Sequence, residues 1–408
     1  MRVCLVNTFH YRRGGDSTYA FDLAYLLESR GDKVVHFAMR HPMNEPSPFD
    51  PYLVSNVDYR AIAEQGSAIH KLAAFPRSLY SREARRKFAR LLDDTKPDVV
   101  HLQNFRRHLT FSILPEAKKR SIPVVMTAHD YDVICPSSLL FAGGRVCEAC
   151  QGHAYYRAAL VRCKDGSLAG SLAVALEGYF ARIMRYYKLI DLIITPSRFA
   201  KSKMVECGRD EHTIRVIPNF IDTSRYEPDY SNDGFIMASS RLSSEKGLDL
   251  LIAALGRLPE TRLVIAGDGP CRDALEQLAV KLGLRNAEFI GYVARDRLLA
   301  MVAKARFVVV PSKCLENFPY SVLEAFALGK PVIASRMGGM PEMVVDGETG
   351  LLFESGDAAA LAEKIAYLER NADLVREMGG KARRRVETEF DSDTHYRSIR
   401  QAYDEARG

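Results

Sequence analysis

The chain has 408 residues, of which 47% are hydrophobic and 26% are charged, with 27 Gly and 18 Pro. This composition is typical of a folded globular protein and excludes a collagen-like or disordered chain. The length predicts two or three domains. Residues 1–215 hold 32 Lys and Arg against 22 Asp and Glu, whereas the remainder is acidic by four charges. This asymmetry either reflects ordinary surface variation or indicates two domains, of which the basic one faces an anionic partner.

The amino-terminal residues 1–7 (MRVCLVN) form too short an apolar run for a signal peptide and are typical of a first β-strand. No window approaches the ~18 consecutive apolar residues that would span a bilayer. We therefore expect a cytoplasmic protein.

Short runs rich in Val and Ile alternate with segments of helical periodicity along the chain. Several runs are apolar throughout, which is typical of parallel strands covered on both faces. Strands are predicted at residues 3–7, 33–38, 98–102, 124–128 and 192–196, and again at 234–238, 262–266, 287–290, 307–311 and 331–334. Residues 216–234, rich in Pro, Asn, Asp and Ser, are typical of a linker. The pattern predicts an α/β chain of two doubly wound domains that binds ligands between them, at the carboxyl ends of the strands.

The loop after the first strand contains Gly14-Gly15 directly before a predicted helix. Backbone N–H groups at such a helix start can approach an anion, and the helix dipole favours a phosphate there. A Gly-Gly pair is also common in plain turns, and it is not the G-x-G-x-x-G pattern of a dinucleotide-binding dehydrogenase. A phosphate site and a simple turn both remain open.

The loop after residues 234–238 places Arg241 and Lys246 on either side of a turn that opens a helix. Two fixed cations there suit a diphosphate, because they can neutralise charge on a departing phosphate. The alternative is an ordinary helix start with incidental basic residues.

The segment ENFPYSVLE, residues 316–324, follows the strand predicted at 307–311. Pro319 suits the first turn of a helix, so Glu316 lies in the preceding loop and Glu324 within the helix. The two carboxylates therefore do not pair along one helix face, but they can hold opposite ends of one ligand.

The order of these motifs is more specific than any one of them. They are Arg241…Lys246-Gly247, Gly267-Asp268-Gly269-Pro270, Glu316-x7-Glu324, Gly338-Gly339-x-Pro341-Glu342 and Asp346-Gly347-x-x-Gly350. This order resembles the retaining glycosyltransferases of family 4, strongly over residues 216–390 and more loosely over 1–215. The resemblance implies the GT-B fold, in which two Rossmann-like domains face each other across a cleft. It implies an acceptor-binding domain at 1–214, a nucleotide-sugar-binding domain at 215–387, and a C-terminal helix at 388–408 that returns to the N-terminal domain.

The resemblance also implies where the nucleotide diphosphate binds. Arg241 and Lys246 would hold the diphosphate, and the amides of Gly14-Gly15 would approach it from the facing domain. Glu324 would accept hydrogen bonds from the ribose hydroxyls, and Gly267 would belong to the donor-binding loops.

The same resemblance implies contacts to the sugar and the base. Glu316 would hold sugar hydroxyls, helped by the backbone amides of Asn317 and Phe318. His129 would contact the transferred sugar near the reacting centre, and the loop at Tyr292-Val293 would lie against the base.

The expected activity is transfer with retention at the anomeric carbon, without a catalytic metal, because Arg241 and Lys246 stabilise the leaving phosphate. The donor is expected to be a UDP- or GDP-sugar. The acceptor is expected to be a saccharide or a lipid-linked saccharide, in cell-surface polysaccharide or glycoconjugate biosynthesis. The alternatives are a nucleotide-sugar epimerase on the same fold and an inactive sugar-binding scaffold. The intact charged residues of the motifs argue against the inactive scaffold.

Two further motifs concern metals. Asp130-Tyr131-Asp132 matches the D-x-D pattern of metal-dependent transferases of another fold, but it follows an N-terminal strand, and we do not expect it to bind a metal. Cys135, Cys147, Cys150 and Cys163 supply four thiolates, the number that tetrahedral zinc or an iron–sulfur cluster requires. We expect a structural zinc site on the acceptor side; a cluster and reduced or redox-active thiols are the alternatives.

The segment SREARRKFARLLDD, residues 81–94, combines an apolar stripe with five basic residues. It is either an ordinary helix with a solvated basic face or a surface for anionic lipid headgroups on the inner face of a membrane. Nucleic acid is not expected, because no aromatic and basic recognition motif accompanies the charge.

Overall fold

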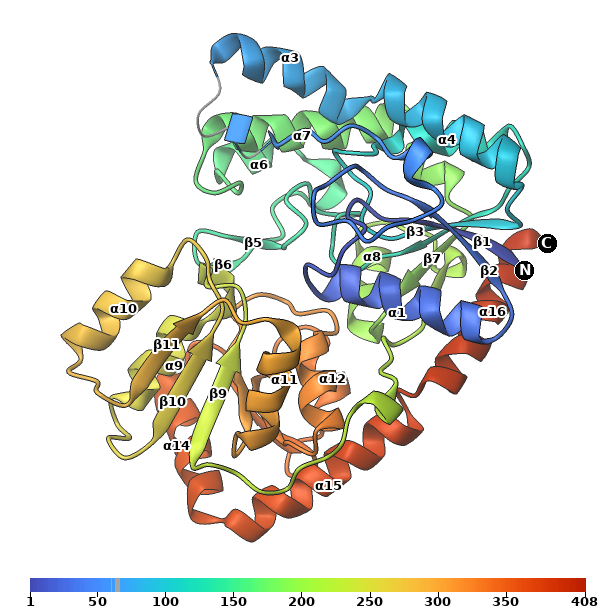
Figure 1. Ribbon diagram of the computed structural model, residues 1–408. Helices are drawn as coiled ribbons and strands as arrows, with labels where there is room; N and C mark the ends of the chain where they lie inside the picture. The colour runs from blue at the N-terminus through green and yellow to red at the C-terminus, as the bar shows by residue number, and fades with distance from the viewer. Residues whose placement is uncertain (60, 63–66) are drawn as a thin grey trace.

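The computed structural model describes residues 1–59, 61–62 and 67–408. Two α/β domains lie one above the other in Figure 1, each built on a six-stranded sheet with helices on both faces. All strand pairs in the two large sheets are parallel. The predicted fold class, two Rossmann-like doubly wound domains, is confirmed.

The N-terminal sheet has the strand order β2-β1-β3-β4-β7-β8. Its central strands are buried along their whole length, which is why they read as continuous apolar runs. The strands are β1 (Arg2–Val6), β2 (Lys33–Phe37), β3 (Val99–Leu102), β4 (Val124–Thr127), β7 (Leu192–Thr195) and β8 (Ile214–Val216). The helices are α1 (Gly15–Ser29), α3 (Ala68–Leu79), α4 (Arg82–Thr95), α5 (Leu114–Lys118), α6 (Arg157–Leu160), α7 (Leu168–Ile183) and α8 (Arg198–Glu206).

The C-terminal sheet has the order β11-β10-β9-β12-β13-β14. Its strands are β9 (Phe235–Ser239), β10 (Arg262–Ala266), β11 (Ala287–Gly291), β12 (Val308–Val310), β13 (Val332–Ser335) and β14 (Gly350–Phe353). Its helices are α9 (Leu248–Leu255), α10 (Arg272–Lys281), α11 (Arg295–Lys304), α12 (Tyr320–Ala327), α13 (Met340–Met343), α14 (Ala358–Arg370) and α15 (Ala372–Thr388).

Shorter elements fill the connections. An antiparallel hairpin of β5 (Phe141–Ala142) and β6 (Arg145–Val146) follows β4 in the N-terminal domain. The 3-10 turns are η1 (Asp50–Tyr52), η2 (Phe111–Ile113), η3 (Gln151–His153), η4 (Tyr186–Leu189), η5 (Glu211–Thr213), η6 (Thr223–Arg225) and η7 (Ser244–Lys246).

The sequence prediction missed the last strand of each sheet. β8 has three residues, one of them Arg215, and β14 starts at Gly350. Neither offers a long apolar run, because β8 is interrupted by Arg215 and β14 has only three apolar residues after its glycine. Pairing with β7 and β13, rather than local composition, defines them.

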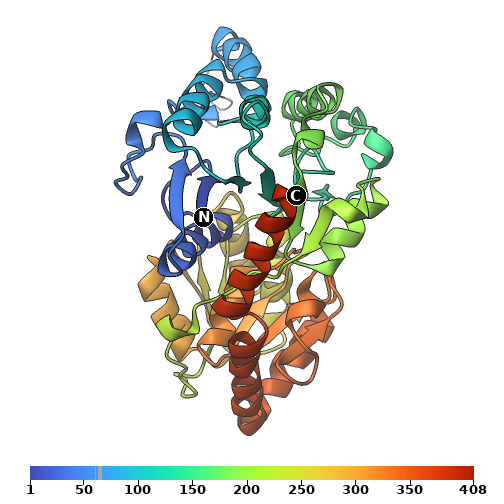
Figure 2. The same ribbon diagram turned by 90° about the vertical axis from the view of Figure 1, so that its right-hand side faces the viewer.

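The last helix, α16 (Ser392–Arg407), leaves the C-terminal domain and runs along the N-terminal one (Figure 2). Its buried Tyr403 hydroxyl lies 2.7 Å from His101 Nδ1 of β3. Arg400 of the same helix lies 2.6 Å from the Asp32 carboxylate. An apolar face and ion pairs from Asp393, Arg400 and Glu405 therefore fix the end of the chain on the N-terminal domain.

Throughout residues 1–59, 61–62 and 67–408, no helix has both the length and the apolar character that crossing a bilayer requires.

Candidate active site

Asn317 joins the loops of the two domains. Its Nδ2 donates to the carbonyl of Ala128 at 3.0 Å, and its Oδ1 accepts from the Ser197 hydroxyl at 2.8 Å. The side chains of Asn317 and Ser197 are buried, so these hydrogen bonds are shielded from water. Ala128 follows β4, Ser197 follows β7 and Asn317 follows β12. The strand ends of both sheets therefore meet here, and the contact puts His129 and Glu316 on adjoining loops.

Glu316 takes part in a largely buried ion pair. Lys246 Nζ lies 2.7 Å from Glu316 Oε1, and the Ser312 hydroxyl donates to the same oxygen at 2.6 Å. Burial alone would raise the pKa of Glu316, but Lys246 and these hydrogen bonds outweigh it and hold that pKa below its ordinary value. Burial would lower the pKa of Lys246, and the carboxylate raises it instead. Both groups are therefore charged at neutral pH.

His129 is a neutral, half-buried imidazole. Its Nε2 lies 2.7 Å from Gln103 Oε1, which can only accept, so Nε2 carries the proton and Nδ1 keeps a lone pair. The ring packs edge-on against Tyr19, with centroids 4.9 Å apart. Burial lowers the pKa of His129 to about 4. Nδ1 can therefore accept a hydrogen bond from a hydroxyl at neutral pH.

The first helix begins at the glycine pair. Gly14 is the N-cap of α1 and Gly15 its first residue. Within the described residues, no acceptor takes the backbone N–H of either glycine. A Cβ at Gly15 would stand 3.7 Å from the ring of Tyr320, which belongs to α12 of the other domain. Free N–H groups at this helix start thus lie next to the C-terminal domain, an arrangement that suits an anion.

Glu324 has its own cation. Its Oε1 accepts from Arg295 Nη2 at 2.7 Å and from Arg295 Nε at 3.2 Å. The same Nη2 donates to the Tyr226 hydroxyl at 2.7 Å. Burial raises the pKa of Glu324, although Arg295 opposes the shift. No donor in the described part of the chain reaches Oε2, so one carboxylate oxygen stays available.

Three loops of the C-terminal domain lie against one another around Gly267. Its N–H donates to the carbonyl of Gly291 at 2.8 Å. At φ +133°, a Cβ on Gly267 would stand 1.9 Å from the Ser240 carbonyl oxygen, so only glycine permits this approach. Arg241 and Tyr292, on the two neighbouring loops, are both exposed. The Arg241 guanidinium makes no hydrogen bond or ion pair to any described residue, which leaves it free for an anion.

Two other predicted positions are packed into the C-terminal core. Phe318 is buried with its ring 5.2 Å from that of Phe390, and Val293 packs against the same cluster. The backbone N–H groups of Asn317 and Phe318 find no acceptor among the described residues. These two amides therefore remain available to a ligand, whereas the Phe318 side chain is structural.

The two metal motifs lie in the N-terminal domain. Burial, and then the neighbouring Asp132, raise the pKa of Asp130 to about 8, so that this carboxyl is largely protonated at neutral pH. The Asp132 N–H donates to Asp130 Oδ1 at 2.8 Å. Cys135, Cys147, Cys150 and Cys163 line a separate hollow.

The sequence analysis missed the residues that orient the predicted ones, namely Gln103, Arg295 and Ser312. Gln103 and Ser312 each follow a strand closely, at the carboxyl ends of β3 and β12, and this position is a usable signal. Arg295 starts α11 and belongs to no motif, so only the fold brings it to Glu324.

Two family models match the chain. The model described as Glycosyltransferase Family 4 matches residues 13–225, which is more than half of the chain. The model described as Glycosyl transferases group 1 matches residues 222–385. The boundary between the two matches falls in the segment that connects the two sheets.

Similar proteins agree with these matches. The glycogen synthase of Mycobacterium tuberculosis (strain ATCC 25618 / H37Rv) is 30% identical, over 69% of this chain and 68% of that protein. The sulfoquinovosyl transferase SQD2 of Arabidopsis thaliana is 25% identical over 72% of this chain, which spans about half (54%) of that relative. Anabaena Alr3699/HepE in complex with UDP-glucose superposes with a TM-score of 0.70 at 18% identity, over 99% of this chain and 100% of that one. Sucrose-phosphate synthase from Thermosynechococcus elongatus gives 0.72 at 20% identity, over 99% and 98%. The chain belongs to glycosyltransferase family 4.

Proposed function

We propose that this chain is a retaining glycosyltransferase that moves a sugar from a nucleotide-diphosphate donor to a saccharide or lipid-linked saccharide. The observation that carries the proposal is the Lys246–Glu316 ion pair. It is joined through Asn317 to the loop that bears His129. The bond that breaks joins the anomeric carbon of the sugar to the diphosphate. The Lys246 cation suits its phosphate end, and the Glu316 carboxylate and the neutral His129 imidazole suit its sugar end.

The donor diphosphate binds between the two domains. The unpaired Arg241, the Lys246 ammonium and the free amides of Gly14 and Gly15 supply positive charge and donors for it. The Oε2 atom of Glu324 accepts from the ribose hydroxyls. The Anabaena neighbour is in complex with UDP-glucose, and a relative in Mycolicibacterium smegmatis is named GDP-mannose-dependent. The proposed donor is therefore a sugar linked to either UDP or GDP.

The sugar lies between Glu316 and His129. The Glu316 carboxylate and the amides of Asn317 and Phe318 bind its hydroxyls. His129 accepts from another hydroxyl through Nδ1. The buried Gln103 Nε2 has no partner among the described residues, and a sugar oxygen would satisfy this donor.

The reaction breaks the bond between the anomeric carbon and the diphosphate oxygen and forms one to the acceptor oxygen. The acceptor proton passes to the departing diphosphate. Arg241 and Lys246 stabilise the charge on that leaving group, so the chemistry needs no metal. Glu316 and Glu324 each bind a cation, so neither is a free nucleophile for a double displacement. Retention then follows from attack by the acceptor oxygen on the same face of the sugar that the diphosphate leaves.

Transfer is favoured over the alternatives. The relatives above are named as a synthase and a transferase, which speaks against an epimerase. The ion pairs of Glu316 and Glu324 speak against an inactive scaffold, because both charged pairs are intact.

Nucleotide binding tests the donor site. UDP or GDP at about 100 times its Kd stabilises the protein by ~2.7 kcal/mol, which raises Tm by about 5–10 °C at 2–4 °C per kcal/mol. Arg241→Ala is expected to weaken binding about tenfold to hundredfold, since hydrogen bonds to charged groups contribute about 1.5–3 kcal/mol. Arg257→Ala, an exposed arginine beyond the end of α9, is the matched control. Binding of neither nucleotide, or equal losses in both variants, contradicts the assignment.

The configuration of the product tests the mechanism. A UDP- or GDP-sugar that binds is incubated with saccharide acceptors, and the anomeric coupling of the product is read by NMR. An α-linked donor is expected to give an α-linked product, at the same rate with and without EDTA. A β-linked product rejects retention. A sugar epimer formed without acceptor rejects transfer.

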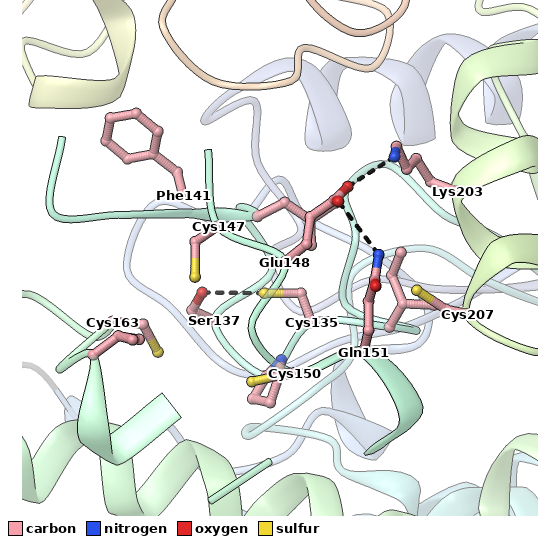
Figure 3. A pocket seen from close by; sticks show the side chains of 14 residues that line it. Cys135, Ser137, Phe141, Cys147, Glu148, Cys150, Gln151, Cys163, Lys203 and Cys207 are labelled. Carbon is pink, nitrogen blue, oxygen red and sulfur yellow. Dashed lines mark hydrogen bonds and ion pairs between the residues drawn. The ribbon is translucent and has the colours of Figure 1, made fainter. Parts of the chain in front are cut away.

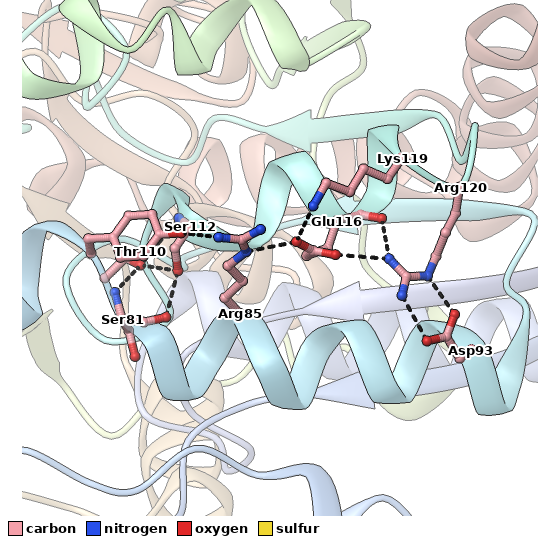
Figure 4. A network of polar contacts seen from close by, with 9 residues as sticks. Ser81, Arg85, Asp93, Thr110, Ser112, Glu116, Lys119 and Arg120 are labelled. Carbon is pink, nitrogen blue, oxygen red and sulfur yellow. Dashed lines mark hydrogen bonds and ion pairs between the residues drawn. The ribbon is translucent and has the colours of Figure 1, made fainter.

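We also propose that the protein binds an anionic membrane surface and takes its lipid-linked acceptor there. The basic face of α4 is partly neutralised: Arg85 lies 2.7 Å from Glu116, which also binds Lys119 and Arg120 (Figure 4). The stronger candidate is an exposed apolar stripe along α7, in the helical layer farthest from the C-terminal domain (Figure 1). It consists of Leu168, Leu172, Leu176, Ile183 and Met184, with exposed Arg162, Arg182 and Arg185 nearby in the chain.

Vesicle binding tests this surface. The protein is expected to co-sediment with vesicles that contain phosphatidylglycerol and to remain free with phosphatidylcholine alone. Leu172→Ser with Leu176→Ser should abolish binding. Leu282→Ser, an exposed leucine of the C-terminal domain, should not. Equal binding by all variants would reject the α7 surface.

A further inference from the structure

Five cysteines line one hollow of the N-terminal domain, beyond the loop that carries His129. They are Cys135, Cys147, Cys150, Cys163 and Cys207. In Figure 3, the sulfurs of the first four point toward a common space beside Ser137, whereas the Cys207 sulfur points elsewhere. None of the five forms a disulfide. The structure thus separates four converging thiols from a fifth that does not join them.

The segment that carries these thiols has little regular secondary structure, although Cys135 and Leu140 pack into the main N-terminal core. Residues 135–165 contain only a hairpin of two-residue strands, a 3-10 turn and the four-residue α6. The local apolar cluster has three fully buried members, Tyr155, Ala158 and Ala175, with Cys150 and Cys163 packed against it. Five non-glycine residues of the segment have positive φ: Ser138, Leu140, His153, Arg162 and Asp165. Such conformations cost about 1–3 kcal/mol each and persist only where surrounding structure imposes them.

We propose that Cys135, Cys147, Cys150 and Cys163 bind one Zn²⁺ ion as a structural, four-thiolate site. Four sulfur ligands fill a tetrahedral shell and leave no open position for catalysis. Binding releases the four thiol protons to solvent, and the four thiolates are held by their attraction to the cation. Among the residues that the structure describes, no three or more Cys, His, Asp or Glu side chains stand at metal-binding distances. A four-thiolate shell therefore requires these side chains to move closer together when the ion binds.

The site anchors the loop next to the proposed reaction centre. The Cys135 N–H donates to the Tyr131 carbonyl at 2.7 Å, and the Tyr131 N–H donates to the Ser138 carbonyl at 3.0 Å. Tyr131 is two residues from His129. A cross-link at Cys135 therefore fixes the turn that follows β4, whereas Cys163 ties the same point to the start of α7.

Metal content is the direct test, and it is independent of transferase activity. The full chain is expressed with zinc and iron supplied together, and the purified protein is measured by mass spectrometry of its metals. We expect about one zinc per chain. Displacement of the thiolates with a mercurial should release that zinc, as followed with a chromogenic chelator.

Single variants identify the ligands. Cys150→Ser and Cys163→Ser should each lower zinc content at least fivefold, whereas Cys207→Ser and Cys271→Ser should retain it. Should a ligand variant fail to fold, the mercurial titration of the wild-type chain still decides whether four thiols react as zinc is released. Zinc-free protein, full zinc in both ligand variants, loss of zinc with Cys207→Ser, or bound iron with visible absorption would each overturn the proposal. So would disulfides among the four cysteines in the unreduced intact mass.

Discussion

Removal of the Lys246 charge isolates the energetic role of the Glu316 ion pair. The substitution Lys246→Met keeps most of the side-chain volume and deletes only the ammonium. The Lys246 side chain is 29% exposed and that of Glu316 is 11% exposed. The variant therefore leaves a largely buried carboxylate whose remaining hydrogen bonds come from Ser312 and Cys314.

The magnitude follows from the geometry. Two unit charges 2.7 Å apart attract by about 6 kcal/mol at an effective dielectric constant of ~20, before the cost of desolvation. Loss of one partner from a buried pair typically costs about 3–5 kcal/mol, and the partial exposure of Lys246 places this pair at the lower end. A loss of about 3 kcal/mol corresponds to a fall of about 6–12 °C in the Tm of a domain of this size.

The loss should depend on pH. In the wild-type chain the pKa of Glu316 is lowered, so the pair stabilises the fold above the ordinary carboxyl pKa of about 4.3 and the contribution is lost as pH falls. In Lys246→Met, burial dominates and raises that pKa, so the folded state takes up a proton. The difference in Tm between the two proteins should be small near pH 5 and largest near pH 8.

Calorimetry at the two pH values is the assay. The double variant Lys246→Met with Glu316→Gln removes both charges and should recover most of the loss. Lys313→Met breaks a surface ion pair with Asp249, expected to contribute at most about 1 kcal/mol, and serves as the control. A Lys246→Met Tm within 2 °C of wild type at pH 8, or a further fall in the double variant, would refute the reasoning.

Three further outcomes are expected. Asn317→Ala removes both interdomain hydrogen bonds and strands buried partners, each costing about 1–3 kcal/mol, so Tm should fall and proteolysis between the domains should rise; unchanged values would contradict the proposed domain contact. Gly267→Ala would place a Cβ 1.9 Å from the Ser240 carbonyl oxygen and should lower Tm more than Gly283→Ala, whose φ is also positive but whose surroundings are open. Acid should destabilise the fold between pH 6.5 and 4, because buried neutral imidazoles with lowered pKa values become protonated on unfolding, each contributing up to about 1.4 kcal/mol per pH unit. The raised pKa values of carboxyl groups such as Asp130, Asp132 and Glu324 oppose this trend, whereas the lowered pKa of Glu177 reinforces it. A Tm that rises on acidification would contradict the assignment of neutral histidines. Five buried or half-buried histidines have the largest shifts, namely His36, His101, His108, His129 and His395, and the pKa values of His10 and His153 are shifted in the same direction.

The local pattern of apolar and polar residues was sufficient to predict the central strands of both sheets and the positions of the loops that bear the motifs. Central strands such as β4 and β10 are buried on both faces, so their apolar runs are visible without a structure. β8 and β14 were not predicted, because both are short: β8 has three residues including Arg215, and β14 has only three apolar residues after Gly350.

The candidate site divides in the same way. The types and order of residues such as Glu316 and Glu324 indicated separate tasks for the two carboxylates. The cation that pairs with each carboxylate could not be predicted from the sequence, because Lys246 lies 70 residues from Glu316 and Arg295 lies 29 residues from Glu324. Which charged side chains form such pairs depends on how the folded loops are arranged and which side chains they bury.

The sequence by itself determined the two-domain α/β plan, the glycines that let loops approach, and the count of four clustered cysteines. These follow from periodicity, backbone freedom and residue chemistry, all of which act over a few residues. Only the tertiary structure decided that Asn317 contacts Ala128 across 189 positions of chain, that α16 packs on the first sheet, and that four cysteine sulfurs face one space while Cys207 does not. The family resemblance implied that the last helix returns to the N-terminal domain, but its contacts, such as Tyr403 with His101, came only from the structure. Those contacts depend on which surfaces are buried together, and no local pattern encodes that choice.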